Sequence, residues 1–192
     1  MHKLLLHICC APDATVAIER LRERYDITGY FYNPNIEPVT EYALREGEVR
    51  RLAGLQGFKH REEPSSHEEW YEACSPLASE PERGARCRVC ISHRLKVTAI
   101  RAADYGCTHF TTTLTTSPHK DVEFIHAMGD TLAKEFGLIY LPETFRSQDG
   151  FRRSLALSRE FDLYRQNYCG CRWSRHTLDM AVHNELKNLA KK

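Results

Sequence analysis

The sequence lacks the features of membrane and secreted proteins. None of its 192 residues belongs to an apolar run long enough to cross a bilayer, and no signal peptide opens the chain. The early apolar run over residues 4–8 is short and is followed at once by polar residues. These absences favour a cytoplasmic protein without a membrane partner.

An excess of charge of one sign is also missing. The 27 Lys and Arg residues nearly balance the 26 Asp and Glu residues, which leaves a formal net charge of +1. Nucleic acid would therefore have to bind a local basic patch, because no global field attracts it. Internal repeats and low-complexity tracts are absent too. The ordinary composition, 42% hydrophobic and 28% charged, suits one domain with a sizeable core over residues 1–192.

Strand-like and helix-like segments alternate along the chain, which predicts an α/β fold with a mostly parallel sheet and right-handed crossovers. The predicted strands cover residues 4–8, 26–32, 58–62, 108–114 and 137–141. The predicted long helices cover residues 12–24, 37–55, 87–105 and 120–136, with short helices between 150 and 164 and an amphipathic helix from about 175 to the end. Residues 63–86 are irregular apart from a short helix near 70–74, and we interpret them as a lid or insertion.

Six of the eight cysteines occur in close pairs: Cys9-Cys10, Cys87-x-x-Cys90 and Cys169-Gly-Cys171. In a reducing compartment, such pairs indicate metal binding or redox chemistry rather than disulfides. The first pair ends a predicted buried strand, which is where α/β proteins place their sites. Cys74 and Cys107 lack a partner at ligand spacing and are interpreted as packing residues.

Asp13 raises the number of candidate ligands to seven, which is more than one structural zinc ion needs. An iron–sulfur cluster takes four Cys, so three ligands remain for a second metal with an open position, as catalytic metals have. Successive strand residues point to opposite sides, so Cys9 and Cys10 can serve different centres. A single zinc site with buried structural thiols remains the simpler alternative.

Two loops contain candidate substrate contacts. Residues 32–35 (Tyr-Asn-Pro-Asn) follow the second strand and either contact a substrate or form a turn. Ser117 and Lys120 follow a central strand near a helix start, where a hydroxyl, free N–H groups and an ammonium suit a phosphate. An N-cap with a solvated Lys explains the second loop about as well.

Residues 146–165 interleave basic and aromatic side chains, as RNA-binding segments do. The segment contains Arg146, Phe151, Arg152, Arg153, Arg159, Phe161, Tyr164 and Arg165. A solvated helix face explains the pattern nearly as well. The ten His residues form no pair at a spacing of four, so we assign His7 to the first strand and not to a metal.

Five motifs, in this order along nearly the whole chain, resemble the QueH-type epoxyqueuosine reductases. They are His7-Ile-Cys-Cys-Ala-Pro12, Tyr32-Asn-Pro-Asn-Ile36, Arg86-Cys-x-x-Cys90 with Arg94, Thr112-Thr-Leu-x-x-Ser-Pro-x-Lys120, and Leu163-Tyr-Arg-Gln-x-Tyr-Cys-Gly-Cys171. Many relatives have Cys where this chain has Asp13.

The resemblance implies a Rossmann-like sheet of about five strands flanked by helices, of the adenine-nucleotide α-hydrolase (HUP) type, with a helical C-terminal part that completes a metal site. It implies a [4Fe–4S] cluster with an adjacent mononuclear iron. The activity it implies is the two-electron reductive removal of the epoxide oxygen of epoxyqueuosine, at the wobble position of tRNA, to give queuosine. It leaves the electron donor unidentified.

On this basis each candidate residue receives an expected role. We expect the cluster on Cys10, Cys87, Cys90 and Cys171, and the second iron on Cys9, Asp13 and Cys169. Cys9, Asp13 and Cys169 are thereby catalytic, together with Tyr164 as a stacking or proton-delivering residue. Candidate contacts to the tRNA substrate are Tyr32, Asn33, Asn35, Ser117, Lys120, Arg152, Arg153 and Arg165.

Two other functions remain as alternatives. A PP-loop-like tRNA sulfur transferase or ATP pyrophosphatase would need a Gly-rich pyrophosphate loop after the first strand. Residues 10–13 contain no Gly, which weighs against that alternative. A non-catalytic, zinc-stapled RNA-binding module would differ from an enzyme in cofactor colour and redox titration.

Overall fold

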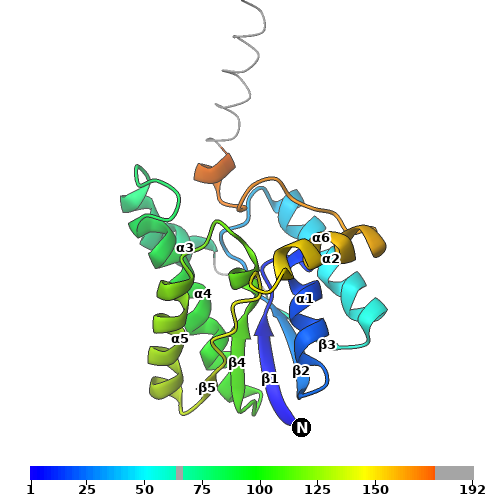
Figure 1. Cartoon of the computed structure of the whole chain (residues 1–192). Helices are drawn as coiled ribbons and strands as arrows, with labels where there is room; N and C mark the ends of the chain where they lie inside the picture. The colour runs from blue at the N-terminus through cyan, green and yellow to red at the C-terminus, as the bar shows by residue number, and fades with distance from the viewer. Residues whose placement is uncertain (64–66, 176–192) are drawn as a thin grey trace, which may run out of the picture.

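A five-stranded parallel sheet forms the centre of the molecule (Figure 1). We describe residues 1–63 and 67–175 of a computed structural model. The strand order is β3-β2-β1-β4-β5, and the strands are β1 (His2–His7), β2 (Tyr25–Phe31), β3 (Lys59–Glu62), β4 (His109–Thr112) and β5 (Ile139–Tyr140). The helices are α1 (Ala11–Leu21), α2 (Val39–Gln56), α3 (His67–Cys74), α4 (Ala85–Asp104), α5 (Val122–Phe136) and α6 (Gly150–Glu160), with short 3₁₀ helices η1 (Ser75–Leu77) and η2 (Thr113–Thr116).

Helices cover both faces of the sheet, because successive residues of β1 are buried against different helices on its two faces. Leu4 and Leu6 are buried in one hydrophobic cluster with residues of α1 and α2, whereas Leu5 is buried in a second cluster with residues of α4 and α5. Because successive strand residues point to opposite faces, a strand buried on both sides is apolar at every position. The expected α/β sheet of five parallel strands is therefore confirmed.

The strand order places a topological switch point at the end of β1. The chain runs outward from β1 through β2 to β3 on one side, and through β4 to β5 on the other. In open α/β sheets the crevice beyond the carboxyl ends of such strands is the usual binding site. Cys9 and Cys10 follow β1 after one residue, Ile8, and α1 begins at the next residue, Ala11.

Several predicted element boundaries differ from the structure by a few residues, and two of these differences lie beside the site. The strand predicted to reach residue 114 ends at Thr112, because Thr112 Oγ1 accepts the N–H of Leu114 and starts the 3₁₀ helix η2. The helix predicted from Lys120 begins at Val122, because Asp121 caps it by accepting the N–H of Phe124. Lys120 therefore precedes α5 and does not lie in its first turn.

The predicted lid segment, residues 63–86, contains α3 and η1. Trp70 and Cys74 of α3 are buried, and α3 packs against α4. Its role as a lid stays a prediction. The amphipathic helix predicted for the C-terminus falls mainly on residues 176–192, outside the described part of the chain. Over residues 1–63 and 67–175, no helix is long and apolar enough to span a bilayer.

Candidate functional site

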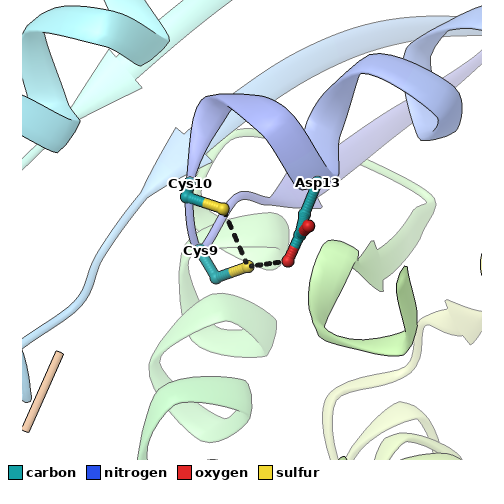
Figure 2. A group of neighbouring side chains, drawn as sticks. All are labelled: Cys9, Cys10 and Asp13. Atoms are coloured by element: carbon teal, nitrogen blue, oxygen red, sulfur yellow. Dashed lines mark hydrogen bonds between the residues drawn. The ribbon is translucent and has the colours of Figure 1, made fainter. Parts of the chain in front are cut away.

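Cys9, Cys10 and Asp13 point toward one another at the end of β1 (Figure 2). Their ligand atoms all lie within 4.8 Å of one another. Cys9 Sγ is 4.0 Å from Cys10 Sγ and 3.5 Å from Asp13 Oδ2. Asp13 lies in the first turn of α1, where side chains lean toward the helix N-terminus, and this brings its carboxylate back to the thiols. Two sulfurs and one carboxylate at this spacing suit a single metal ion.

Neighbouring polar groups hold this trio in place. Thr113 Oγ1 accepts the backbone N–H of Cys9 at 3.1 Å and lies 3.2 Å from Cys9 Sγ. Gln166 Nε2 donates to Cys10 Sγ at 2.9 Å. Sequence reasoning missed both residues, because a Thr in a predicted strand and a Gln in a predicted loop give no signal of a thiol partner.

Burial of Cys10 and Asp13 favours a bound cation. The hydrogen bond with Cys9 and burial raise the pKa of Cys10 well above its ordinary value, and burial raises the pKa of Asp13. Both shifts disfavour the negatively charged forms, and a metal ion between these groups would offset that cost.

Four further thiols, Cys87, Cys90, Cys169 and Cys171, line a second, enclosed space. Cys87 and Cys90 lie in the first two turns of α4, one turn apart. Cys169 and Cys171 flank Gly170, whose φ of +119° is rarely adopted by a residue with a side chain. Arg45 fixes this turn by donating to the carbonyl oxygens of Tyr168 and Cys169.

Cys10 has different neighbours from those expected, and Cys169 borders both ligand sets. The sequence-based assignment placed Cys10 with the cluster cysteines and Cys169 with Cys9 and Asp13. Cys10 lies with Cys9 and Asp13 instead. Cys169 lines the space shared by Cys87, Cys90 and Cys171, and it also borders a larger cavity with Cys9 and Asp13.

Lys120 lies against Cys169. Its Nζ is 3.1 Å from Cys169 Sγ and 3.3 Å from Glu82 Oε1. Burial on its own would raise the pKa of Cys169, but the Lys120 ammonium outweighs burial and lowers that pKa. Burial likewise opposes the charge of Lys120, yet the Cys169 thiolate raises the pKa of Lys120 overall. The buried Lys120 ammonium therefore favours the thiolate form of Cys169.

Two buried polar groups at the four-thiol space have unused donors. Arg94 is 2% exposed and donates to Asn33 Oδ1, while its Nε has no hydrogen-bond partner. None of the ion pairs found in the described residues includes Arg94. Trp70 Nε1 is buried without a partner as well. A buried guanidinium without a carboxylate is costly, and an anionic group beside it removes that cost. A thiolate-bound metal group fits this requirement.

A cavity of about 470 Å³ opens beside both sets of ligands. Cys9, Asp13 and Cys169 contribute to its wall, together with three of the predicted substrate contacts, Ser117, Lys120 and Arg165. Gln166 and Asn167 add amide groups. A volume of this size is typical of small-molecule sites, and here it can admit a single nucleobase.

The remaining predicted residues make contacts elsewhere. The Tyr32 hydroxyl lies 3.1 Å from His93 Nε2, and Asn33 Nδ2 donates to the Ile8 carbonyl, so both support the loop after β2. Asn35 lines the four-thiol space. The Tyr164 hydroxyl donates to Glu41. Surface ion pairs join Arg152 to Asp149 and Arg153 to Glu19.

The two unpaired cysteines are buried in hydrophobic clusters, as expected of packing residues. Cys107 lies in the cluster of α4 and α5, away from the other thiols. Cys74 packs in the cluster that contains Trp70 and Cys171, and burial raises the pKa of Cys74 to about 12. Cys74 thus borders the four-thiol space, which its isolated position in the sequence does not reveal.

Solved structures with low sequence identity share this fold. A U34-tRNA thiolase NcsA from Methanococcus maripaludis, solved with its [4Fe-4S] cluster, matches with a TM-score of 0.57 at 15% identity over 97% of this chain and 67% of that chain. A predicted subunit of tRNA methyltransferase from Methanocaldococcus jannaschii matches with a TM-score of 0.55 at 16% identity over 80% of this chain and 74% of that chain. At this identity, the likeness concerns the fold alone.

Sequence comparison identifies the family. Proteins named epoxyqueuosine reductase QueH are 38% identical over 174 residues in Streptococcus pyogenes, covering 88% of this chain and 68% of the relative, and 37% identical over 177 residues in Thermotoga maritima, covering 91% of each. The sequence model of the same family matches residues 4–177, which include all seven candidate ligands. The chain therefore belongs to the epoxyqueuosine reductase QueH family.

Proposed function

We propose that this protein is an oxidoreductase that reduces the epoxide of epoxyqueuosine in tRNA and leaves the alkene of queuosine. The observation that carries the proposal is that three distant segments bring their thiols and one carboxylate to two spaces at the sheet edge, which share Cys169 and Lys120 in their walls. The family names of the relatives give the substrate, and tRNA is accordingly the macromolecular partner.

The two ligand sets suit two different metal groups. Cys9, Cys10 and Asp13 converge closely enough for one iron ion. Cys87, Cys90, Cys169 and Cys171 surround a space, which suits a [4Fe–4S] cluster because a cubane separates its ligands more than one ion does. The unused donors of Arg94 and Trp70 favour an anionic group in that space. The NcsA thiolase, which has this fold, was solved with such a cluster.

The overall reaction needs two electrons and two protons, and the epoxide oxygen leaves as water. When bound, the cluster would supply electrons one at a time, and the single iron would act as a Lewis acid at the oxygen. The protein would orient the base in the cavity so that its epoxide faces Cys9 and Asp13. Ser117 and Arg165 of the cavity wall would contact the nucleotide.

We also propose that the modified base lies at the wobble position of the tRNA and that the protein acts in the cytoplasm. A separate electron donor, not yet identified, would supply the electrons. Arg152 and Arg153 remain candidate tRNA contacts, although each has a surface carboxylate partner that RNA would have to displace. The Tyr164 hydroxyl donates a hydrogen bond to Glu41. Tyr164 is therefore better placed to orient that carboxylate than to deliver a proton to the substrate.

Anaerobic reconstitution with iron and sulfide tests the proposal. We expect iron and sulfide to bind in amounts that fit one cubane plus one further iron, with the visible absorption and paramagnetic signal of a reducible cluster. The Cys90→Ala variant should lose the cluster and reductase activity, because Cys90 lines the four-thiol space.

The matched control is Cys107→Ala. Cys107 is also a buried thiol, 7% exposed, but it lies in the cluster of α4 and α5 away from the site, so this variant should keep metal and activity. A protein that binds only zinc would favour the zinc-stapled RNA-binding module. Full cluster content in Cys90→Ala would remove Cys90 from the site.

A further inference from the structure

The side chain of Lys120 is almost completely buried at the site. It is 10% exposed, whereas that of its carboxylate partner Glu82 is 47% exposed. The Nζ contact to Cys169 Sγ, at 3.1 Å, is the shorter of its two polar contacts, and the Glu82 contact is 3.3 Å. Solvent screens Glu82 more than Cys169, so the thiolate is the stronger partner of the ammonium.

Lys120 also stands between the two spaces of the site. It lines the cavity for substrate and the four-thiol space, and Cys169 lines both as well. The loop before α5 is fixed, because Arg146 Nη1 donates to the carbonyl oxygens of Ser117 and Lys120, both at 3.1 Å. The ammonium is therefore held at a defined position, and the phosphate-binding role predicted from the sequence would require it to leave Cys169.

We infer that Lys120 is a positioning residue whose ammonium, held 3.1 Å from Cys169 Sγ, raises the reduction potential of the metal group bound there. The inference rests on the proposed function, since it assumes that Cys169 is a ligand. A fixed positive charge in a buried site stabilises the state that carries one more electron. Net charge and hydrogen bonds at the sulfurs are known to set the potentials of iron–sulfur clusters. Lys120 thereby makes the cluster easier to reduce without itself exchanging protons or electrons.

The experiment is a redox titration of the reconstituted full-length protein, followed by visible absorption, with iron content measured on each sample. Lys120→Met removes the charge and keeps an unbranched side chain, whereas Lys120→Arg keeps the charge. We expect Lys120→Met to lower the equilibrium constant for one-electron reduction roughly tenfold, a fall of about 59 mV in midpoint potential. Lys120→Arg should restore most of that loss.

Glu82→Gln is the matched control, because it removes the other partner of the same ammonium. The Glu82 side chain is 47% exposed, so solvent screens its charge. Removing that charge should raise the midpoint potential slightly, the opposite direction to the fall expected for Lys120→Met. If Lys120→Met loses iron while Lys120→Arg keeps it, the positive charge is what holds Cys169, which supports the inference.

Three results would overturn it. The first is an unchanged midpoint potential in Lys120→Met at full iron content. If that variant also binds tRNA more weakly, Lys120 is a phosphate ligand instead. Another is loss of iron from both Lys120→Met and Lys120→Arg, since charge would then not be the decisive property. The third is a fall in the midpoint potential of Glu82→Gln as large as the fall in Lys120→Met. If the unmodified protein itself takes up no iron, the proposed function fails, which is a separate outcome.

Discussion

At the scale of single residues, the end of β1 decides which thiols act together. The alternation rule predicted that Cys9 and Cys10 point to opposite sides, but the rule applies only inside a strand. β1 ends at His7, and Cys10 is already the N-cap of α1, with φ −165° and ψ 159°. The intervening turn brings both sulfurs to the same side, next to Asp13.

The proposed places of Cys10 and Cys169 in the two ligand sets can be tested directly. Cys10→Ser should lose about one iron per chain and keep the absorption of the cluster, because Cys10 lies with Cys9 and Asp13. Cys169→Ser should lose or destabilise the cluster, because Cys169 lines the four-thiol space. Iron and sulfide counts, with the cluster spectrum, distinguish the two losses. The reverse pattern would support the assignment made from the sequence alone.

At the scale of elements, the Cys-Gly-Cys turn depends on a backbone that only Gly adopts readily. Gly170 has φ +119°, and a Cβ there would lie 3.0 Å from Ile36 Cγ1 and 3.2 Å from Arg45 Nη1. Gly170→Ala should therefore cost about 1–3 kcal/mol of stability and reduce iron loading, because Cys169 and Cys171 flank the strained residue. Urea unfolding and iron counts measure the two effects.

Gly57→Ala provides the comparison for that variant. Gly57 ends α2 with φ +67°, but a Cβ there would meet no atom within 4 Å. We expect a loss of about 1 kcal/mol and unchanged iron loading. Equal iron loading in both variants would show that the geometry of the Cys169–Cys171 turn does not control the site.

The elements themselves could largely be predicted, because apolar periodicity and turn residues determine them locally. All five strands and the long helices of the described part appear near their predicted positions. The contacts that define the site could not be predicted, since they depend on tertiary packing. Lys120 illustrates this: its motif suggests either a phosphate ligand or a solvated side chain, and only the packing of the C-terminal turn places Cys169 against it. Arg94 belongs to one of the five motifs, but only the structure shows its unused Nε and adds Trp70 to the site.

At the scale of the whole molecule, the switch point at β1 explains how distant cysteines meet. β1, the loop into α4 and the segment after α6 all reach the same edge of the sheet, where Figure 1 shows the C-terminal segment crossing toward α3. Cys spacing along the chain can reveal each pair. It cannot reveal which pairs share a metal group, because that depends on how the three segments cross.

Because several histidines are buried, we expect the free energy of unfolding to fall in mild acid. Burial is the main cause that lowers the pKa of five of them: His7, His60, His93, His109 and His126. Each binds a proton less readily in the folded chain than in the unfolded chain, where histidine titrates at about pH 6.5, so the unfolded state binds more protons in that range. The free energy of unfolding should therefore fall as pH decreases from about 7.5 to 5.5.

His126 allows one contribution to be isolated, because it lies away from the candidate ligands. Its ring nitrogens each lie 3.1 Å from a hydroxyl, of Tyr140 and of Thr144, so protonation would require the hydroxyl that donates to the neutral ring to turn and accept instead. His126→Gln cannot titrate, and its free energy of unfolding should fall less steeply between the two pH values. Urea unfolding of both proteins, loaded with iron in the same way, measures the difference and cancels the effect of metal release. Parallel pH profiles would mean that His126 titrates alike in the folded and unfolded chains, contrary to the effect of its burial.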